Sequence, residues 1–344
     1  MKKIIFGLFS LLILALACLY AGYNYVINLG KVRLINNATP FEVYRGDNLT
    51  RVINRLIGDE NSLRVKFYIY LHPEFNNLKT SYYDLKEARN LHQALEIINS
   101  GKGITVSIRL IPGRTWQQWD SYLNTLDNSV NNDLQNLTPQ QIAQKLGIKA
   151  IDGDKNFNSL EGYFSPNTFI INYRASLSSA LKLSYQELEK NLHEAWKARN
   201  QYSQVKSPYE LLILASIIEK EKGNDQEATL ISSVFNNRLK IGMRLQADPT
   251  VIYGMGDKYK GNITRNDLNT PTPYNTYTIN GLPPTPIAMV SKASLMAAAQ
   301  PANTNYLYFM AVFGQSKHAF ASTYAEHVKN VQKFNQEYRK TYGK

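Results

Sequence analysis

Two carboxylates end a strongly apolar helical stretch in the C-terminal half of this 344-residue sequence. Residues 208–222 read PYELLILASIIEKEK, a pattern that predicts a helix hydrophobic almost all round and therefore buried. A carboxyl group that emerges from such a helix is partly desolvated, which raises its pKa and suits it to general-acid catalysis. Glu219 and Glu221 are the two candidates. The alternative is a solvated helix end at which both glutamates neighbour Lys220 and Lys222.

Helical spacing favours Glu219 over Glu221. On a repeat of about 3.6 residues, Glu219 lies over Ala215 and Ser216, whereas Glu221 lies over the bulky pair at 217–218. Small side chains beneath a carboxylate leave room for a substrate, and bulky ones are typical of a core. We therefore expect Glu219 to face a cleft.

Polar groups follow this helix along the chain. The next helix, expected at 226–241, carries Asn237 and Arg238 at the end of its apolar stripe, either as surface residues or turned into a cleft. A segment at 242–290 contains six of the 13 prolines, and its 269–277 portion places aromatic rings beside amide and hydroxyl groups. Sugar chains are bound by such a mixture, although surface turns have the same composition.

Other kinds of chemistry find little support. The chain has a single cysteine, Cys18, which excludes a disulfide framework and a cysteine-built metal site. Its five histidines are not paired at ligand spacing, so we expect no metal and no cofactor. His318 and His327 are expected to be structural histidines with satisfied hydrogen bonds. Phosphate-binding loops, the nucleophile elbow and nucleic-acid signatures are absent from the sequence, and a nucleic-acid partner is not expected.

The N-terminus predicts a membrane anchor. An uninterrupted apolar run from Ile4 to about Gly22 nearly spans a hydrocarbon core of roughly 30 Å. A retained span is favoured over a cleaved signal peptide or a lipidated Cys18, because no small-residue exit site follows and apolar residues continue past the cysteine. Lys2 and Lys3 favour a cytoplasmic N-terminus. We expect a single-pass inner-membrane protein with its bulk in the periplasm.

The elements expected to position these residues make an α+β fold. Strands are expected at 41–44 and 104–111, and each leads through a turn into a helix. A helix is expected at 139–146. Beyond Glu161 the chain is expected to be mainly helical, with helices at 184–200, 208–222, 226–241 and 322–339 that are broken by the loop-rich segment. The predicted parts are a cytoplasmic tip at 1–3, a transmembrane helix at 4–24, a linker at 25–40, a small α+β subdomain at 41–123, a connecting segment at 124–158 and a mainly helical domain at 159–340.

Several motifs follow one another from the apolar helix to the C-terminal part. They are ASIIEKE at 215–221, NRL at 237–239, IGMRLQ at 241–246, DPTVIYGMG at 248–256, YNTY at 274–277, GLPP at 281–284, YLYF at 306–309 and HAF at 318–320. This ordered set resembles the YceG-like family of endolytic murein transglycosylases. The unit around 46–49 is similar to that family's LysM-like subdomain. The chain departs from the family pattern at Lys222, where a threonine is usual, and around 289–291.

The resemblance implies nonhydrolytic cleavage of the β-1,4 bond between N-acetylmuramic acid and N-acetylglucosamine in peptidoglycan. Glu219 would be the catalytic acid and then the base, and the muramyl C6 hydroxyl would close a 1,6-anhydro ring. The enzyme would terminate or trim nascent glycan strands, with cuts inside strands, and glycan-polymerising synthases are the expected partners. The substrate-binding residues that the resemblance implies are Asn237, Arg238, Gln246, Asp248, Tyr274, Asn275, Thr276, Tyr277 and His318.

Two alternatives stay open. One is a peptidoglycan-binding scaffold of the wall-synthesis machinery without activity, and the other is a hydrolytic muramidase. The formal net charge of +12, from 39 basic and 27 acidic residues, suggests a polyanionic partner. With a membrane anchor and glycan motifs in the same chain, we expect this positive charge to face anionic lipid headgroups and peptide-stem carboxylates.

Overall fold

The chain mixes helices with short strands, as the α+β expectation requires. A computed structural model describes residues 2–58, 61–155 and 157–343, so Met1 of the predicted cytoplasmic tip lies outside the described residues. Contacts divide the chain into two compact units. The first comprises Met1–Val106 and Ile170–Ala175, and the second comprises Ser107–Phe169 and Ser176–Lys344.

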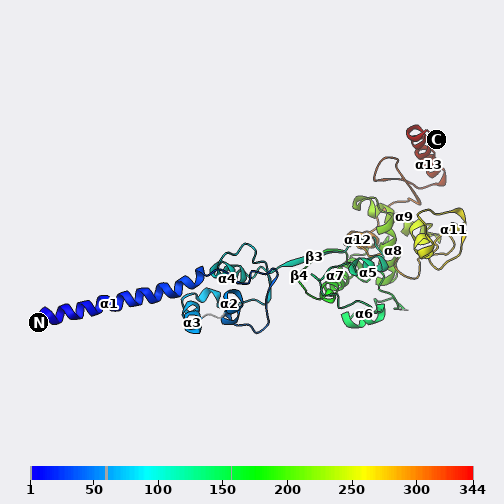
Figure 1. Cartoon of the computed structure of the whole chain (residues 1–344). Helices are drawn as coiled ribbons and strands as arrows, with labels where there is room; N and C mark the ends of the chain where they lie inside the picture. The colour runs from blue at the N-terminus through cyan, green and yellow to red at the C-terminus, as the bar shows by residue number, and fades with distance from the viewer. Residues whose placement is uncertain (1, 59–60, 156, 344) are drawn as a thin grey trace. The chain divides into compact units, whose positions relative to one another are not determined.

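The first unit begins with a long apolar helix, α1 (Lys2–Ile27), which extends from the rest of the unit (Figure 1). Its side chains from Lys3 to Tyr23 are exposed, and it is long and apolar enough to cross a membrane. The predicted span at 4–24 lies within α1. The expected linker at 25–40 begins inside the helix, and its Leu29 is fully buried in the core of this unit.

A small core holds the rest of the first unit together. Strands β1 (Phe41–Val43) and β2 (Ser81–Tyr83) pair in antiparallel fashion, with Phe41 opposite Tyr83. The helices of this unit are α2 (Leu49–Ile57), α3 (Ser62–Leu71) and α4 (Leu91–Ser100), with short 3₁₀ turns at Asn28–Lys31 and Pro73–Asn76. The core is formed by the apolar faces of α2, α4 and the 28–31 turn, together with one side of α3.

The chain passes between the units within a pair of strands. β3 (Thr105–Arg109) and β4 (Thr168–Asn172) form a two-stranded sheet, and the unit boundaries fall inside both strands. The predicted strand at 104–111 is therefore confirmed, whereas its partner β4 was not predicted.

The second unit is mainly helical. A two-stranded sheet joins β5 (Tyr308–Ala311) to β6 (His318–Ala321), with Tyr308 opposite Ala321. The helices are α5 (Trp116–Leu123), α6 (Pro139–Leu146), α7 (Leu177–Lys197), α8 (Pro208–Glu221), α9 (Ala228–Lys240), α10 (Asp248–Met255), α11 (Arg265–Asn269), α12 (Lys292–Ala299) and α13 (Tyr324–Tyr342), with 3₁₀ turns at Asp225–Glu227 and Gly256–Lys258. The helices expected at 184–200, 208–222, 226–241 and 322–339 are thus present with shifted ends.

Helix α8 is the centre of this unit, as its composition predicts. Every residue from Leu211 to Ile218 is buried, because α7, α9, α10 and α12 pack around it. Ser207 caps its N-terminus by accepting a hydrogen bond from the backbone N–H of Glu210. The two carboxylates at its other end are thereby held on a rigid, buried element.

Helix α5 belongs to the second unit by its contacts. The Trp116 ring stacks on Phe164 with 5.3 Å between centroids, and the indole N–H of the buried Trp119 donates to the carbonyl of Ile111. The contact units consequently divide the chain after Val106 rather than at 123. The functional domains expected at 41–123 and 159–340 stay predictions.

Candidate active site

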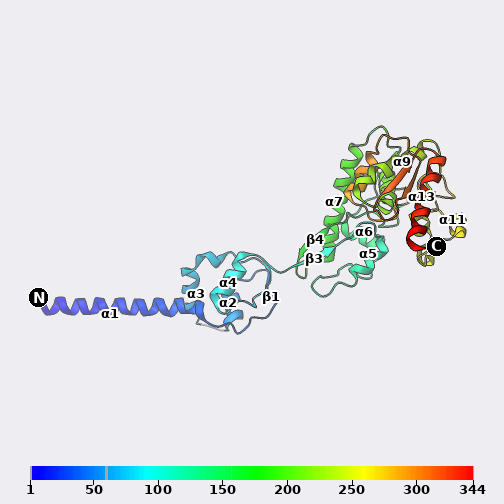
Figure 2. The ribbon, with the colours of Figure 1, turned by 90° about the horizontal axis from the view of Figure 1, so that it is seen from above.

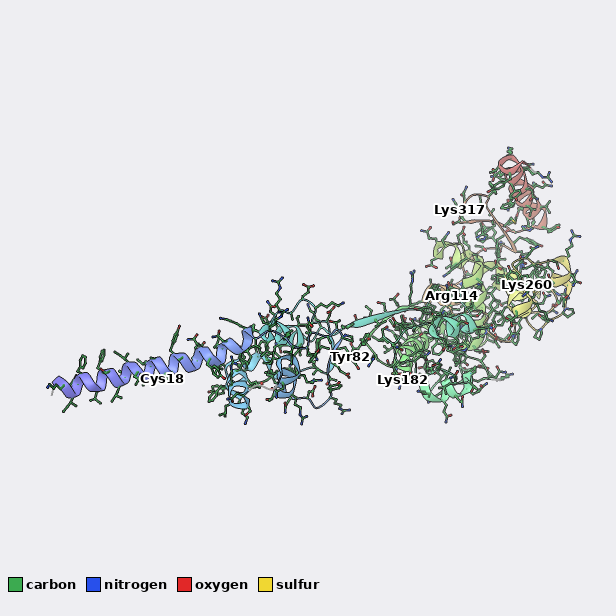
Figure 3. The ribbon with its side chains drawn as sticks, viewed as in Figure 1. Cys18, Tyr82, Arg114, Lys182, Lys260 and Lys317 are labelled. Atoms are coloured by element: carbon green, nitrogen blue, oxygen red, sulfur yellow. The ribbon has the colours of Figure 1, made fainter. Side chains whose placement is uncertain are left out.

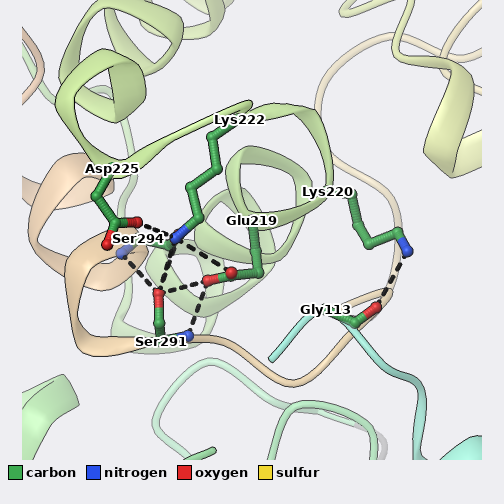
Figure 4. Close-up of polar contacts among 7 residues, drawn as sticks. All are labelled: Gly113, Glu219, Lys220, Lys222, Asp225, Ser291 and Ser294. Atoms are coloured by element: carbon green, nitrogen blue, oxygen red, sulfur yellow. Dashed lines mark hydrogen bonds and ion pairs between the residues drawn. The ribbon is translucent and has the colours of Figure 1, made fainter. Parts of the chain in front are cut away.

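Glu219 is held by three donors at the end of α8. Its Oε2 accepts hydrogen bonds from the backbone N–H of Ser291 at 2.9 Å and from the Ser291 hydroxyl at 2.5 Å. The ammonium of Lys222 lies 3.1 Å from Oε1. Figure 4 shows that Lys222 also contacts Asp225 and the Ser291 hydroxyl, which makes one connected polar cluster. The Glu219 side chain is only 5% exposed.

The cluster depends on how α8 meets the start of α12. Ser291 is the N-cap of α12, and α12 packs along α8, so the cap hydroxyl and N–H point at the end of the neighbouring helix. Glu219 is thus held by the N-cap residue of α12 as well as by Lys222, the C-cap residue of its own helix.

The structural reason for preferring Glu219 is corrected by the structure. Ala215 and Ser216 were expected to leave room for a substrate, but both are fully buried. The Ser216 hydroxyl donates to the carbonyl of Ile213 and accepts from the N–H of Ile287, so the 286–290 segment fills the space above the small residues. Helical spacing gives the direction of this face but not the segment that packs on it.

Glu221 occupies a different environment. Burial and the nearby charge of Asp248 raise its pKa to about 7, while the guanidinium of Arg238 opposes the shift. Such a carboxyl is about half protonated at neutral pH, which is the property expected of a general acid. On the criterion of desolvation, the structure thus gives Glu221 the character that the sequence expected of Glu219.

A third carboxyl, Glu161, was not singled out from the sequence. It is 3% exposed, accepts a hydrogen bond from the Trp116 N–H at 3.1 Å and another from the Tyr253 hydroxyl at 3.2 Å, and burial raises its pKa to about 7. Glu161 and Tyr253 help to line a cavity of about 670 Å³. The sequence signal that could have identified Glu161 is a single acidic residue between Leu160 and the aromatic residues that follow.

Asn237 and Arg238 both hold the segment before β5. The Asn237 amide donates to the carbonyls of Thr304 and Tyr306, each at 2.9 Å. The buried Arg238 guanidinium donates to the carbonyls of Leu307 and Leu245 and lies over the Tyr308 ring. Both side chains are turned inward, and their direct contact with a substrate stays a prediction.

The residues expected from the loop motifs divide into exposed and buried groups. Gln246 and Asp248 are exposed, and Asp248 accepts a 2.6 Å hydrogen bond from the Tyr277 hydroxyl. Asn275 and Thr276 are fully buried. The Asn275 amide donates to three carbonyls between 267 and 270, and the Thr276 hydroxyl contacts Thr250 and accepts from the N–H of Ala247. These two residues shape the loop that carries Tyr277.

Tyr274 and His318 lie in separate places. Tyr274 packs on Tyr253 with 4.8 Å between ring centroids and helps to line a second cavity, of about 850 Å³. His318 is paired with Glu227, its Nδ1 lying 3.0 Å from the carboxylate and its backbone N–H donating to the same group. The structural interpretation of this histidine fits these contacts.

His327 departs from the expectation of satisfied hydrogen bonds. Its buried Nδ1 has no hydrogen-bond partner among the described residues, and its ring stacks on Tyr308. Burial and the charge of Arg238 lower its pKa. The sequence could not show this because the ring is covered by β5, which is distant in sequence.

The site thus contains three largely buried carboxyl groups, two in the last turn of α8 and one against Tyr253 of α10. Glu219 meets Ser291, Glu221 faces Asp248 and Arg238, and Glu161 lies against Tyr253. Within the described residues, no group of three His, Cys, Asp or Glu side chains could hold a metal ion. What this arrangement can supply is proton transfer by buried carboxyl groups beside aromatic and amide side chains.

The YceG-like family matches the chain over residues 41–333, which includes every carboxyl group described above. The chain belongs to the YceG-like family. A solved yceG-like protein from Listeria monocytogenes is similar in fold, with a TM-score of 0.54 and 28% identity over 84% of this chain and 97% of that one. The match covers most of both chains, so it extends beyond the motifs.

Two curated relatives carry the name endolytic murein transglycosylase. The Bacillus subtilis protein is 39% identical over 176 residues, which are 51% of this chain and 48% of the relative. The Streptococcus pneumoniae protein is 26% identical over 289 residues, or 75% of this chain and 51% of the relative. The chain thus spans about half the length of the curated relatives that it matches.

Proposed function

We propose that this protein is a membrane-anchored lytic transglycosylase that cuts peptidoglycan glycan strands internally. The observation that carries the proposal is a carboxylate, Glu219, held at the end of the buried helix α8 inside the segment that matches the family. The name of the two curated relatives supports the same reaction.

In the proposed reaction Glu219 protonates the oxygen that leaves the muramyl C1. The C6 hydroxyl of the same muramyl residue then attacks C1, and Glu219 takes up the hydroxyl proton. The products are a free 4-hydroxyl on N-acetylglucosamine and a 1,6-anhydromuramyl end, and the carboxyl regains its starting state. Because the nucleophile is part of the substrate, one carboxyl group suffices where hydrolytic glycosidases need two.

The contacts of Glu219 define what must change during this cycle. In the structure Glu219 accepts hydrogen bonds from Ser291 and forms an ion pair with Lys222, and these contacts would favour the carboxylate form that the base step needs. For the acid step it has to exchange one of these contacts for a proton. Glu221 is the competing assignment, because burial raises its pKa to about 7 without such donors.

The remaining parts of the proposal concern location and partners. We place α1 in the inner membrane with a cytoplasmic N-terminus, and the two compact units in the periplasm. The first unit serves as a LysM-like glycan-binding module, and peptidoglycan synthases are the proposed protein partners. Gln246, Asp248, Tyr274 and Tyr277 are proposed to contact the glycan from the α10 side.

The first prediction concerns the acid. Glu219→Gln is expected to abolish strand cleavage, whereas Glu210→Gln, which changes a carboxyl in the first turn of the same helix, should leave most of it. The measurement is digestion of purified glycan strands followed by mass spectrometry. Anhydro ends, one water lighter than reducing ends, support a lytic transglycosylase.

Other outcomes of the same digestion separate the alternatives. If Glu219→Gln retains activity and Glu221→Gln does not, the acid is Glu221. Reducing ends would identify a hydrolytic muramidase, which the additional buried carboxyls Glu161 and Glu221 could support as a second catalytic group. Binding without any product would identify a scaffold.

A further inference from the structure

Helix α3 of the first unit has an apolar face that no part of the described chain covers. Leu63, Phe67 and Tyr70 are 61%, 58% and 80% exposed, and Leu71 is 39% exposed. Their successive spacings of four, three and one residues place all four on one face of the helix. The opposite side carries Val65 and Tyr68, which are buried in the core of the unit.

Basic residues flank the exposed stripe. On a helix of about 3.6 residues per turn, Arg64 lies at one edge of the stripe and Lys66 at the other. Long basic side chains at the edges of an apolar face can reach lipid headgroups while the apolar groups enter the boundary below. This arrangement is typical of helices that lie in a membrane interface.

The position of α3 beside α1 supplies the second observation. The Arg64 guanidinium stacks on the Tyr25 ring at 4.3 Å and its Nε donates to the Tyr25 carbonyl at 2.9 Å. Tyr25 lies three residues, or about 4.5 Å, beyond the apolar run that ends at Gly22. In both views α3 lies at the end of this unit from which α1 extends (Figures 1 and 2).

The junction with α1 is also rigid. Val26 and Leu29, in and just after the last turn of α1, pack into the same core as Val65 and Tyr68. Once α1 spans a bilayer, the core and the Arg64–Tyr25 contacts therefore hold the start of α3 near the bilayer surface.

We propose that α3 is a second membrane contact, which inserts Leu63, Phe67, Tyr70 and Leu71 into the headgroup boundary of an anionic bilayer. This inference rests on the proposed membrane anchor. Its consequence is that the first unit is fixed against the membrane surface, so the chain extends toward the glycan strands from a defined orientation.

The test uses the full chain in vesicles of phosphatidylethanolamine and phosphatidylglycerol. An environment-sensitive fluorophore is attached at Cys18 in the native chain, or at position 67 in Cys18→Ser/Phe67→Cys. Cys18 is exposed, and Figure 3 shows it on the part of α1 that extends beyond the rest of this unit. The matched control is Cys18→Ser/Arg45→Cys, because Arg45 is exposed and follows β1, which Figure 2 places at the opposite end of the unit.

We expect nitroxide-labelled lipids to quench the fluorophore at position 67 several-fold more than at position 45, and aqueous iodide to do the reverse. Lys66→Glu should weaken the lipid quenching at 67 in anionic vesicles.

If the Cys18 fluorophore is not quenched by lipid, the anchor itself fails. If Cys18 is quenched while 67 behaves like 45, the anchor stands and the α3 contact is wrong. Protection from iodide without lipid quenching would mean that protein covers the helix, which also overturns it.

Discussion

At the scale of single residues, the chemistry of this protein depends on which neighbours each carboxyl meets. Glu219 and Glu221 are two positions apart on one helix, yet one lies against Ser291 and Lys222 and the other is desolvated near Asp248. The side chains are chemically identical, so packing alone separates a donor-bound carboxylate from a carboxyl with a pKa of about 7.

Glu161 gives a prediction about pH and stability. Its pKa is about 7 in the folded chain against 4.5 when exposed, so the folded state holds the proton more tightly. The stability contribution therefore falls as pH rises from 4.5 to 7, by about 3 kcal/mol in total. We expect Glu161→Gln to remove this part of the pH dependence of the unfolding free energy. The measurement is urea unfolding followed by tryptophan fluorescence between pH 5 and 8.

The control for that experiment is Asp120→Asn, which replaces an exposed carboxyl on α5. It is expected to keep the wild-type slope of unfolding free energy against pH. An unchanged slope in Glu161→Gln would show that this carboxyl titrates in the folded chain as it does in water.

At the scale of elements, the site is a meeting of two helix ends. The C-terminal turn of α8 supplies Glu219, and the N-cap of α12 supplies the hydroxyl and N–H that hold it. A cap residue thus has two tasks, because the Ser291 Oγ accepts from the N–H of Ser294 at 3.4 Å and donates to Glu219. Removing it affects both helix stability and the carboxylate.

Ser291→Ala tests this double role against Thr138→Ala, which removes the N-cap of α6. Each substitution is expected to cost about 1 kcal/mol of stability. Only Ser291→Ala should also slow glycan cleavage, by about tenfold for each 1.4 kcal/mol added to the activation free energy when Glu219 is less well positioned. Ser291→Thr should restore the rate. Equal activity of the two alanine variants would show that the cap has no catalytic role.

At the scale of the whole molecule, the chain has two separate hydrophobic cores. The first unit is built around residues such as Leu56, and the second around α8 with Leu214 at its centre. Trp116, Trp119 and Trp196, the three tryptophans of the sequence, all belong to the second unit. Tryptophan fluorescence therefore reports the unfolding of the second unit alone.

We expect Leu56→Ala to destabilise the first unit by about 2–5 kcal/mol, because it leaves a cavity in a fully buried position. The melting temperature measured by far-ultraviolet circular dichroism should fall for that unit, while the tryptophan transition stays in place. Leu214→Ala is the mirror control and should lower the tryptophan transition. A tryptophan midpoint that falls in Leu56→Ala would show that the two units unfold together.

Local pattern was enough for the elements with strong signals. The strongly apolar 208–222 stretch predicted α8, Pro139 to Leu146 predicted α6 without a shift of either end, and the turn at 45–48 predicted the start of α2. Helix periodicity, caps and proline positions are properties of a few consecutive residues. For that reason they can be read from the sequence before any packing is known.

Tertiary structure decided the character of the site, because its contacts join residues that no local pattern relates. Ser291 is 72 positions from Glu219, and Tyr253 is 92 positions from Glu161. Helical spacing shows which way Glu219 and Glu221 point, but desolvation and charge depend on what packs there. The sequence determined that two carboxylates end a buried helix, and the fold decided which of them is bound by donors and which is desolvated.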